Sequence, residues 1–196
     1  MKFAVFVTFC LLTIAALCAL KPVYAASLQS ASLEVFVDGV ARFKGTIIIE
    51  ENEASVTVPI LASEEHLYNV LVADEKGSML AYDINGQNMV IYSLDAMQVT
   101  LEYDTDVLTS KSGGLWTLAF TSPFEIEVLL PRNSTIVYIN AAPMSLKAEG
   151  DTVRLKLSPG YWEICYEVGV QSHVPTPQPQ PVGWPFEWLI LGAAGA

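Results

Sequence analysis

Few side chains in this sequence have the type and spacing that metal binding requires. The two histidines, His66 and His173, are far apart, and neither stands among the clustered Cys, Asp or Glu residues of a metal site. Asp104 and Asp106 offer two carboxylates of the kind that calcium prefers, but the glycine and further acids of a calcium loop are missing. We therefore expect a strand that ends in a polar loop at Asp104, no metal site and no cofactor.

Covalent and acid–base catalysis find equally little support. The chain contains no G-x-S-x-G motif. Cys165 lies between Glu163 and Glu167, a setting that does not activate a thiol, and we expect a half-buried strand residue. Glu125 and Glu127 fall on one strand face, which is typical of paired glycosidase carboxylates and also of any solvated strand. We expect no catalytic residue, and a hydrolase with dispersed carboxylates is the alternative.

One modification motif stands in a suitable place. Asn133-Ser134-Thr135 is an N-glycosylation sequon that follows Pro131-Arg132 between two expected strands. The sequence therefore predicts Asn133 as a glycosylation site, provided that this part of the chain is exported.

The composition excludes one class of partner. The 196 residues are 52% apolar and 16% charged, with 10 Lys and Arg against 21 Asp and Glu, so the formal net charge is −11. Binding to a phosphate backbone needs clustered cations. We expect no nucleic-acid partner for this chain.

The first residues have the pattern of a secretory signal. Lys2 precedes an almost unbroken apolar run from Phe3 to Leu20, and a small residue, Ala25, ends the segment. We predict a signal peptide over residues 1–25, with an uncleaved N-terminal anchor as the alternative. Cleavage leaves Cys165 as the single cysteine, so the mature domain cannot form an internal disulfide.

The other end predicts a stalk and an anchor. Residues 171–183 form a proline-rich linker of the extended, semi-rigid type. Residues 184–196 begin with an aromatic belt at Trp184 and Trp188 and continue with apolar or small residues only, which predicts the start of a transmembrane helix that continues past Ala196. A hydrophobic tail packed on the domain is the alternative. We expect a single-pass cell-membrane protein whose domain is extracytoplasmic.

The middle of the chain predicts one all-β domain. Over residues 27–170 apolar and polar residues alternate, which indicates about eleven short, mostly antiparallel strands in a β-sandwich. Asp38-Gly39 and Asn85-Gly86 predict tight hairpins, and Ser63–Tyr68 is the best candidate for a short helix. Six residues on two aromatic strands are expected to point into the core: Trp116, Leu118, Phe120, Trp162, Ile164 and Tyr166.

The order of these parts resembles exported archaeal ectodomains held by a single C-terminal transmembrane helix. The residues that carry the resemblance are 33–40, 99–106 with 108–111, 114–118 and 175–181. In that group the ectodomain is uncharacterised, and some members resemble membrane-bound winged-helix regulators. The resemblance supplies no catalytic residue, and it implies no DNA-binding role for a chain without the cytoplasmic part.

These observations together predict a non-enzymatic cell-surface ectodomain. We expect it to bind or sense a protein or carbohydrate ligand, or an envelope partner, outside the cell. One alternative is a structural envelope or filament component, in which an unpaired edge strand pairs with another copy. Another is the sensor part of a membrane-bound transcriptional regulator.

Overall fold

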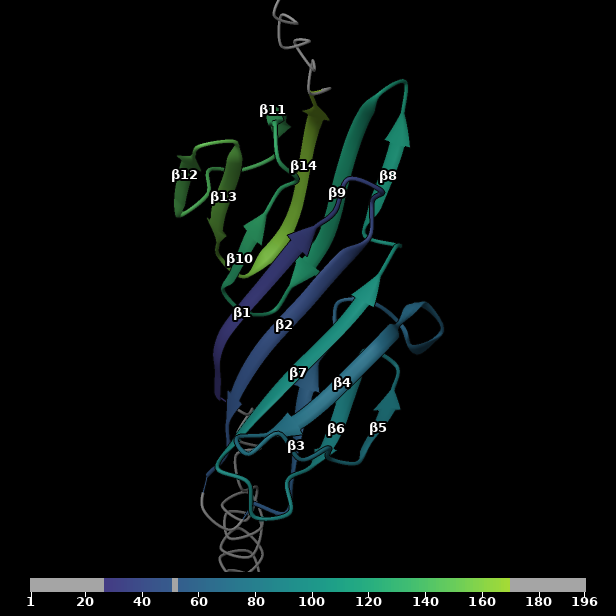
Figure 1. The fold of residues 1–196 in the computed structure, drawn as a ribbon, viewed down its shortest axis with the longest axis vertical. Coiled ribbons are helices and arrows are strands. Elements are labelled where there is room, and N and C mark those ends of the chain that lie inside the picture. The colour runs from purple at the N-terminus through teal and green to yellow at the C-terminus, as the bar shows by residue number, and fades with distance from the viewer. Residues whose placement is uncertain (1–26, 51–52, 170–196) are drawn as a thin grey trace, which may run out of the picture.

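The described part of the protein is built from strands in three sheets. The computed structural model describes residues 27–50 and 53–169 (Figure 1). The predicted signal peptide, linker and transmembrane start at 1–25, 171–183 and 184–196 all lie outside these ranges. Within the described ranges, no helix has the length and apolar character that crossing a membrane requires.

The largest sheet has seven strands in the order β12-β13-β10-β1-β2-β7-β4. Its only parallel neighbours among the described strands are β1 and β10; the other adjacent pairs are antiparallel. The bounds of its strands are β1 (Ser27–Val35), β2 (Ala41–Ile48), β4 (Tyr68–Asp74), β7 (Gln98–Thr105), β10 (Ile126–Leu129), β12 (Ser145–Glu149) and β13 (Thr152–Leu157).

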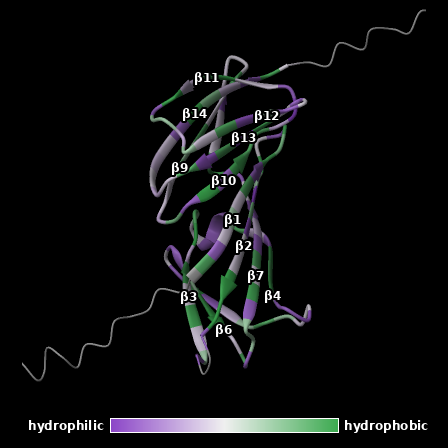
Figure 2. Cartoon of the chain, turned by 90° about the vertical axis from the view of Figure 1, so that its left-hand side faces the viewer, coloured by the Kyte–Doolittle hydropathy of each residue, from purple (hydrophilic) through white to green (hydrophobic). Residues whose placement is uncertain are grey.

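Two smaller sheets cover one face of this long sheet. A four-stranded sheet packs at one end in the order β11-β14-β9-β8, and a three-stranded sheet packs at the other in the order β3-β6-β5 (Figures 1 and 2). The bounds are β3 (Ser55–Pro59), β5 (Tyr82–Asn85), β6 (Asn88–Tyr92), β8 (Thr109–Ser112), β9 (Leu115–Ser122), β11 (Ser134–Ile139) and β14 (Gly160–Val168). The result is a sandwich in which two short sheets share one long partner.

The predicted all-β class is confirmed, but the strand count was too low. Fourteen strands form within the described ranges. The number was underestimated because β8 and β12 are short polar segments without the alternation that marks a half-buried strand. Both predicted hairpins are confirmed, at Asp38-Gly39 between β1 and β2 and at Asn85-Gly86 between β5 and β6. The expected short helix is reduced to a single 3-10 turn, η1 (Glu64–His66).

The prediction of which side chains of the two aromatic strands, β9 and β14, point into the core is also confirmed. The six residues expected to point inward are all buried: Trp116, Leu118, Phe120, Trp162, Ile164 and Tyr166. In the other half of the sandwich, the rings of Phe43 and Tyr103 stack at 4.9 Å between centroids. The Leu61 backbone N–H donates to the Tyr103 hydroxyl at 3.0 Å, which satisfies this buried polar group.

The turn between β1 and β2 is locked to the four-stranded sheet. Gly39 has φ +91°, and a Cβ added there would stand 2.5 Å from the ring of Trp116. The Thr109 hydroxyl of β8 donates to the Gly39 carbonyl. The hairpin tip therefore fits under β8 and β9 only without a side chain at residue 39.

This close approach predicts a difference between two glycine substitutions. Gly39→Ala combines the strain of a left-handed backbone with overpacking against Trp116, while Gly77→Ala (φ +83°, open space around the Cβ) carries the strain alone. We expect Gly39→Ala to lower the free energy of unfolding by about 1–3 kcal/mol more than Gly77→Ala. Urea unfolding of the full chain, followed by tryptophan fluorescence, measures both. Equal losses would show that the turn is not packed on Trp116.

Candidate functional site

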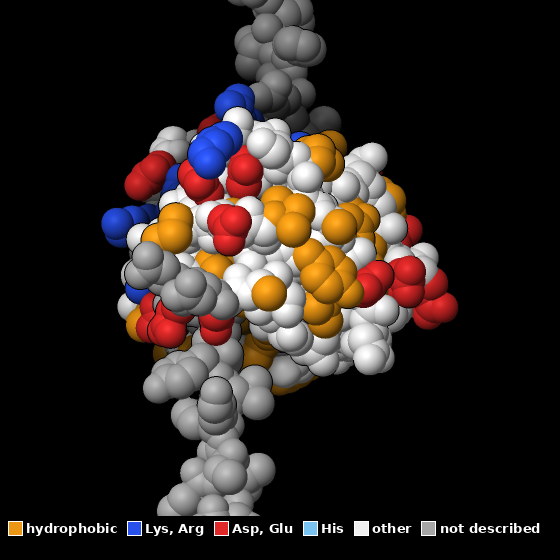
Figure 3. Space-filling view, turned by 90° about the horizontal axis from the view of Figure 1, so that it is seen from below, with side chains coloured by type: hydrophobic (Ala, Val, Ile, Leu, Met, Phe, Trp, Pro, Cys, Tyr) orange, Lys and Arg blue, Asp and Glu red, His pale blue; other side chains and the backbone are white. Residues whose placement is uncertain are grey.

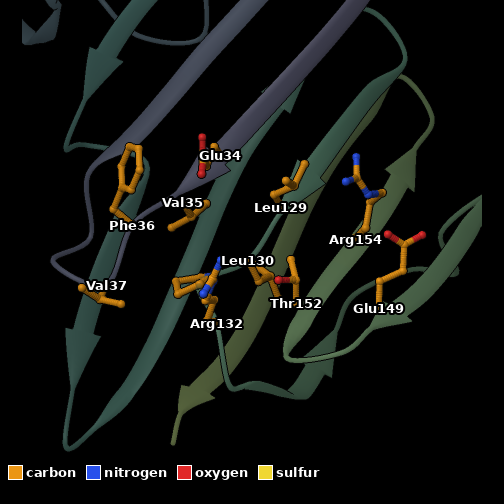
Figure 4. A pocket seen from close by; sticks show the side chains of 11 residues that line it. Glu34, Val35, Phe36, Val37, Leu129, Leu130, Arg132, Glu149, Thr152 and Arg154 are labelled. Carbon is orange, nitrogen blue, oxygen red and sulfur yellow. The ribbon is translucent and has the colours of Figure 1, made fainter. Parts of the chain in front are cut away.

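A crevice opens where the two parallel strands end. β1 and β10 run in the same direction, so their carboxyl ends lie side by side. From there the chain leaves β1 by the turn to β2 and leaves β10 toward β11 in the other sheet. The diverging connections leave a crevice of about 480 Å³, which we call the β1/β10 crevice (Figure 4).

The floor and one side of the crevice are apolar. Val35 and Leu130 are buried at its base, and Leu129 is half-buried beside them. Phe36 and Val37 come from the turn after β1. The Arg42 guanidinium lies 5.3 Å above the Phe36 ring, whereas the Val37 side chain is 65% exposed at the mouth. An apolar side chain of a ligand would therefore find a preformed surface here.

The rim carries charges of both signs from four parts of the chain. Arg154 of β13 forms an ion pair with Glu127 of β10, so the charge of Arg154 is already compensated within the sheet. Arg132 is 78% exposed and lies 3.9 Å from Asp151, a loose pair. The carboxylates of Glu34 and Glu149 complete the rim, as Figure 4 shows. This arrangement suits a ligand with an apolar body and polar groups of mixed charge.

A second, more polar hollow lies on the other side of the Arg154–Glu127 pair. Its volume is about 390 Å³, and its wall includes residues 29–32 of β1 and the start of β10. The Lys156 ammonium and the Glu125 carboxylate face each other across 2.8 Å at this wall. One ion pair therefore separates the β1/β10 crevice from this second hollow.

The long sheet also carries a buried carboxylate on another of its strands, β7. Asp104 of β7 is almost fully buried and accepts two hydrogen bonds from Arg42, at 2.7 and 3.0 Å. Asn69 donates to the same carboxylate at 2.8 Å from a left-handed backbone conformation, φ +54°. The hydrogen bonds from Arg42 hold the pKa of Asp104 below its ordinary value although burial acts to raise it, and Asn69 strengthens the lowering.

The strand end expected at Asp104 is present, since β7 ends at Thr105 and the exposed Asp106 follows it. The burial of Asp104 and its pairing with the partly exposed Arg42 were not expected. Sequence reasoning missed the cluster because Arg42 and Asn69 are distant along the chain. No residue pattern signalled the burial of Asp104, because it shares the polar phase of the strand with Thr100 and Glu102.

The other singled-out residues do not come together as a site. Glu125 and Glu127 each pair with a cation of β13, and His66 is exposed in η1 beside Glu65. Cys165 is half-buried, as expected, with its sulfur 3.6 Å from the Thr117 hydroxyl. In the part of the chain that the structure describes, no three His, Cys, Asp or Glu side chains gather in a way that could hold a metal ion.

The sequon lies beside the crevice. Asn133 follows Arg132 in the connection from β10 to β11 and has φ +60°. Its backbone N–H donates to the Asp151 carbonyl at 2.7 Å, and its carbonyl accepts from Gly169 at 2.9 Å. Glycosylation of Asn133 stays a prediction, and a glycan there would stand next to the rim.

Apolar side chains are also exposed away from the crevice. The face seen from below shows apolar side chains next to acidic ones (Figure 3), and Leu94 and Met97, in the connection between β6 and β7, are exposed. We therefore place the candidate site at the β1/β10 crevice, where apolar and charged groups converge.

The comparisons with known proteins give only distant structural matches. No family model matches the chain, and no curated protein sequence does. A solved structure of an aminopeptidase N family protein from Idiomarina loihiensis matches 70% of this chain and 29% of its own, with TM-score 0.47 and 8% identity. An M1 zinc metallopeptidase from Deinococcus radiodurans matches 74% and 42%, with TM-score 0.42 and 10% identity. The chain thus spans less than half the length of either protein.

The prediction of a non-enzymatic ectodomain is contradicted, because the solved structures that match part of the chain are those of enzymes. With TM-scores below 0.5 and identities of 8% and 10%, the matches carry no activity, metal or substrate over to this chain.

The cluster of Arg42, Asn69 and the buried Asp104 predicts an acid-dependent loss of stability. Because the folded pKa of Asp104 lies below its unfolded value of about 3.9, the cluster contributes stability above that pH, and this contribution is lost as the pH falls through the folded pKa. Asp104→Asn should lower the free energy of unfolding by roughly 2 kcal/mol at pH 7, because Arg42 loses its partner. The deficit should shrink toward pH 2.

Urea unfolding across this pH range measures the effect, with Asp106→Asn as the matched control, because its side chain is exposed. The control should stay within about 0.5 kcal/mol of the unmodified chain at every pH. A deficit of Asp104→Asn that is the same at pH 7 and at pH 2 would contradict the assignment.

Proposed function

We propose that the β1/β10 crevice binds a polypeptide segment through an apolar side chain of that segment. The observation that carries the proposal is the pairing of a buried apolar floor, Val35 and Leu130, with a rim of two arginines and two glutamates. A polypeptide supplies the matching groups, because its side chains are apolar or charged and its backbone offers donors and acceptors throughout.

The same surface favours a polypeptide over a carbohydrate. Sugars stack on exposed, flat aromatic faces, and the one aromatic residue of the crevice, Phe36, is half-buried with Arg42 over its ring. The rim acids disfavour a nucleic acid, since phosphates require clustered cations.

The setting of this activity is also a proposal. The secretory pattern of residues 1–25 and the apolar pattern of residues 184–196 support export and membrane attachment. The crevice would then meet its polypeptide outside the cytoplasm, where a glycan on Asn133 would limit access from one side.

The proposal can be tested by measuring binding to a variant that carries a charged side chain at the mouth of the crevice. We expect the full chain to bind fluorescein-labelled β-casein, an unfolded polypeptide, in a saturable manner by fluorescence anisotropy. Val37→Glu places a carboxylate at the apolar mouth and should weaken binding by about tenfold or more. The matched control is Val137→Glu on β11, at a valine that is similarly exposed and outside the crevice, and it should bind as the unmodified chain does.

Absence of casein binding by the unmodified chain would overturn the proposal. So would an equal loss in both valine variants, which would indicate a general charge effect. Binding of a labelled dextran in place of casein would point to a carbohydrate.

A further inference from the structure

The one aromatic ring that lines the β1/β10 crevice is contacted from outside the crevice. Phe36 lies in the turn after β1 (Figure 4), where its N–H donates to the Val40 carbonyl at 2.8 Å and its carbonyl accepts from the Gly39 N–H at 3.0 Å. These bonds fix the backbone of Phe36 and leave its ring free to turn. The Arg42 guanidinium lies 5.3 Å from the centroid of that ring, a distance at which a cation attracts the ring face. Arg42 therefore restrains the direction of the ring.

Arg42 is itself held at two points. A long side chain that samples many rotamers would restrain a neighbouring ring poorly. Here the Nε and Nη2 groups of Arg42 donate to the two carboxylate oxygens of Asp104 at 2.7 and 3.0 Å. A two-point contact of this kind fixes the plane of a guanidinium as well as its position.

The carboxylate that holds Arg42 is fixed in its turn. Its side chain is only 5% exposed, and it belongs to β7, which pairs with β2 on one side and β4 on the other. Asn69 of β4 donates to the same carboxylate at 2.8 Å, at the point where the register between β4 and β7 is irregular. Contacts between side chains thus run from Asn69 through Asp104 and Arg42 to the ring of Phe36.

The other acids near Arg42 do not replace Asp104. Glu102 lies 3.6 Å from Arg42, but it is shared with Lys44 at 3.8 Å, and both distances are too long for a hydrogen bond. Arg42 is not among the residues that line the crevice. Any influence of Arg42 on a ligand in the crevice therefore passes through Phe36.

We propose that Arg42 is a positioning residue of the β1/β10 crevice. Held by Asp104, it keeps the Phe36 ring in place as a preformed wall for the apolar side chain of the bound polypeptide. A wall that is ordered before binding loses less freedom on binding, which increases affinity. This inference deepens the proposed function and rests on it, because it assigns a role to residues outside the crevice.

Nuclear magnetic resonance of the full chain tests the contact without any ligand. We expect a nuclear Overhauser effect between the Arg42 side chain and the ring protons of Phe36. Asp104→Asn should abolish it, because the neutral amide no longer holds the guanidinium at two points. Asp106→Asn, at an exposed position just past β7, is the matched control and should leave it unchanged.

Casein binding to a set of variants tests the effect on the crevice. Asp104→Asn and Arg42→Lys should each weaken binding by about three- to tenfold, the second although it keeps the positive charge. Lys44→Gln is the control for charge, because Lys44 lies on the same strand outside the crevice, and it should bind within about twofold of the unmodified chain.

A double variant separates positioning from a general loosening of the fold. Asp104→Asn combined with Phe36→Leu should bind as Phe36→Leu alone does, because the ring that Arg42 holds is then absent. Each variant is measured where its tryptophan fluorescence shows the folded state.

Three outcomes would overturn the inference: an Overhauser effect that persists in folded Asp104→Asn, losses of affinity that add in the double variant, or a loss in Lys44→Gln as large as in Arg42→Lys. Absence of casein binding by the unmodified chain would overturn the proposed function instead. The Overhauser effect, measured without casein, would then still support or refute the contact between Arg42 and Phe36.

Discussion

The parallel pairing of β1 with β10 is the constraint on which the β1/β10 crevice depends. Three residue pairs join these strands, and every other described neighbour pair in the sheets is antiparallel. Because the two strands are parallel, their carboxyl ends lie at the same end of the pair. From there the chain leaves β1 by the turn to β2 and leaves β10 toward β11 in the four-stranded sheet. The crevice is the space between these two connections.

The short length of β10 has local causes. Pro131 follows Leu130, and a proline offers no backbone N–H with which a strand could continue its pairing. At the other end, Ser122 bonds with Phe124 in a tight bend directly before the strand. Ile126 and Val128 are buried between these limits, which fixes the phase of the strand. These limits keep β10 to four residues and place the crevice directly after it.

The sequence predicts the local parts of this fold better than the contacts between distant parts. Period-two alternation and the two turn dipeptides report neighbouring residues, so the hairpins and the inward side of Trp162 could be predicted. The pairing of Leu33 with Val128 joins segments with no shared sequence signal, and the crevice follows from that pairing. The Arg42–Asp104 ion pair escaped prediction for the same reason. β12 escaped because its side chains are mostly exposed and show no apolar phase.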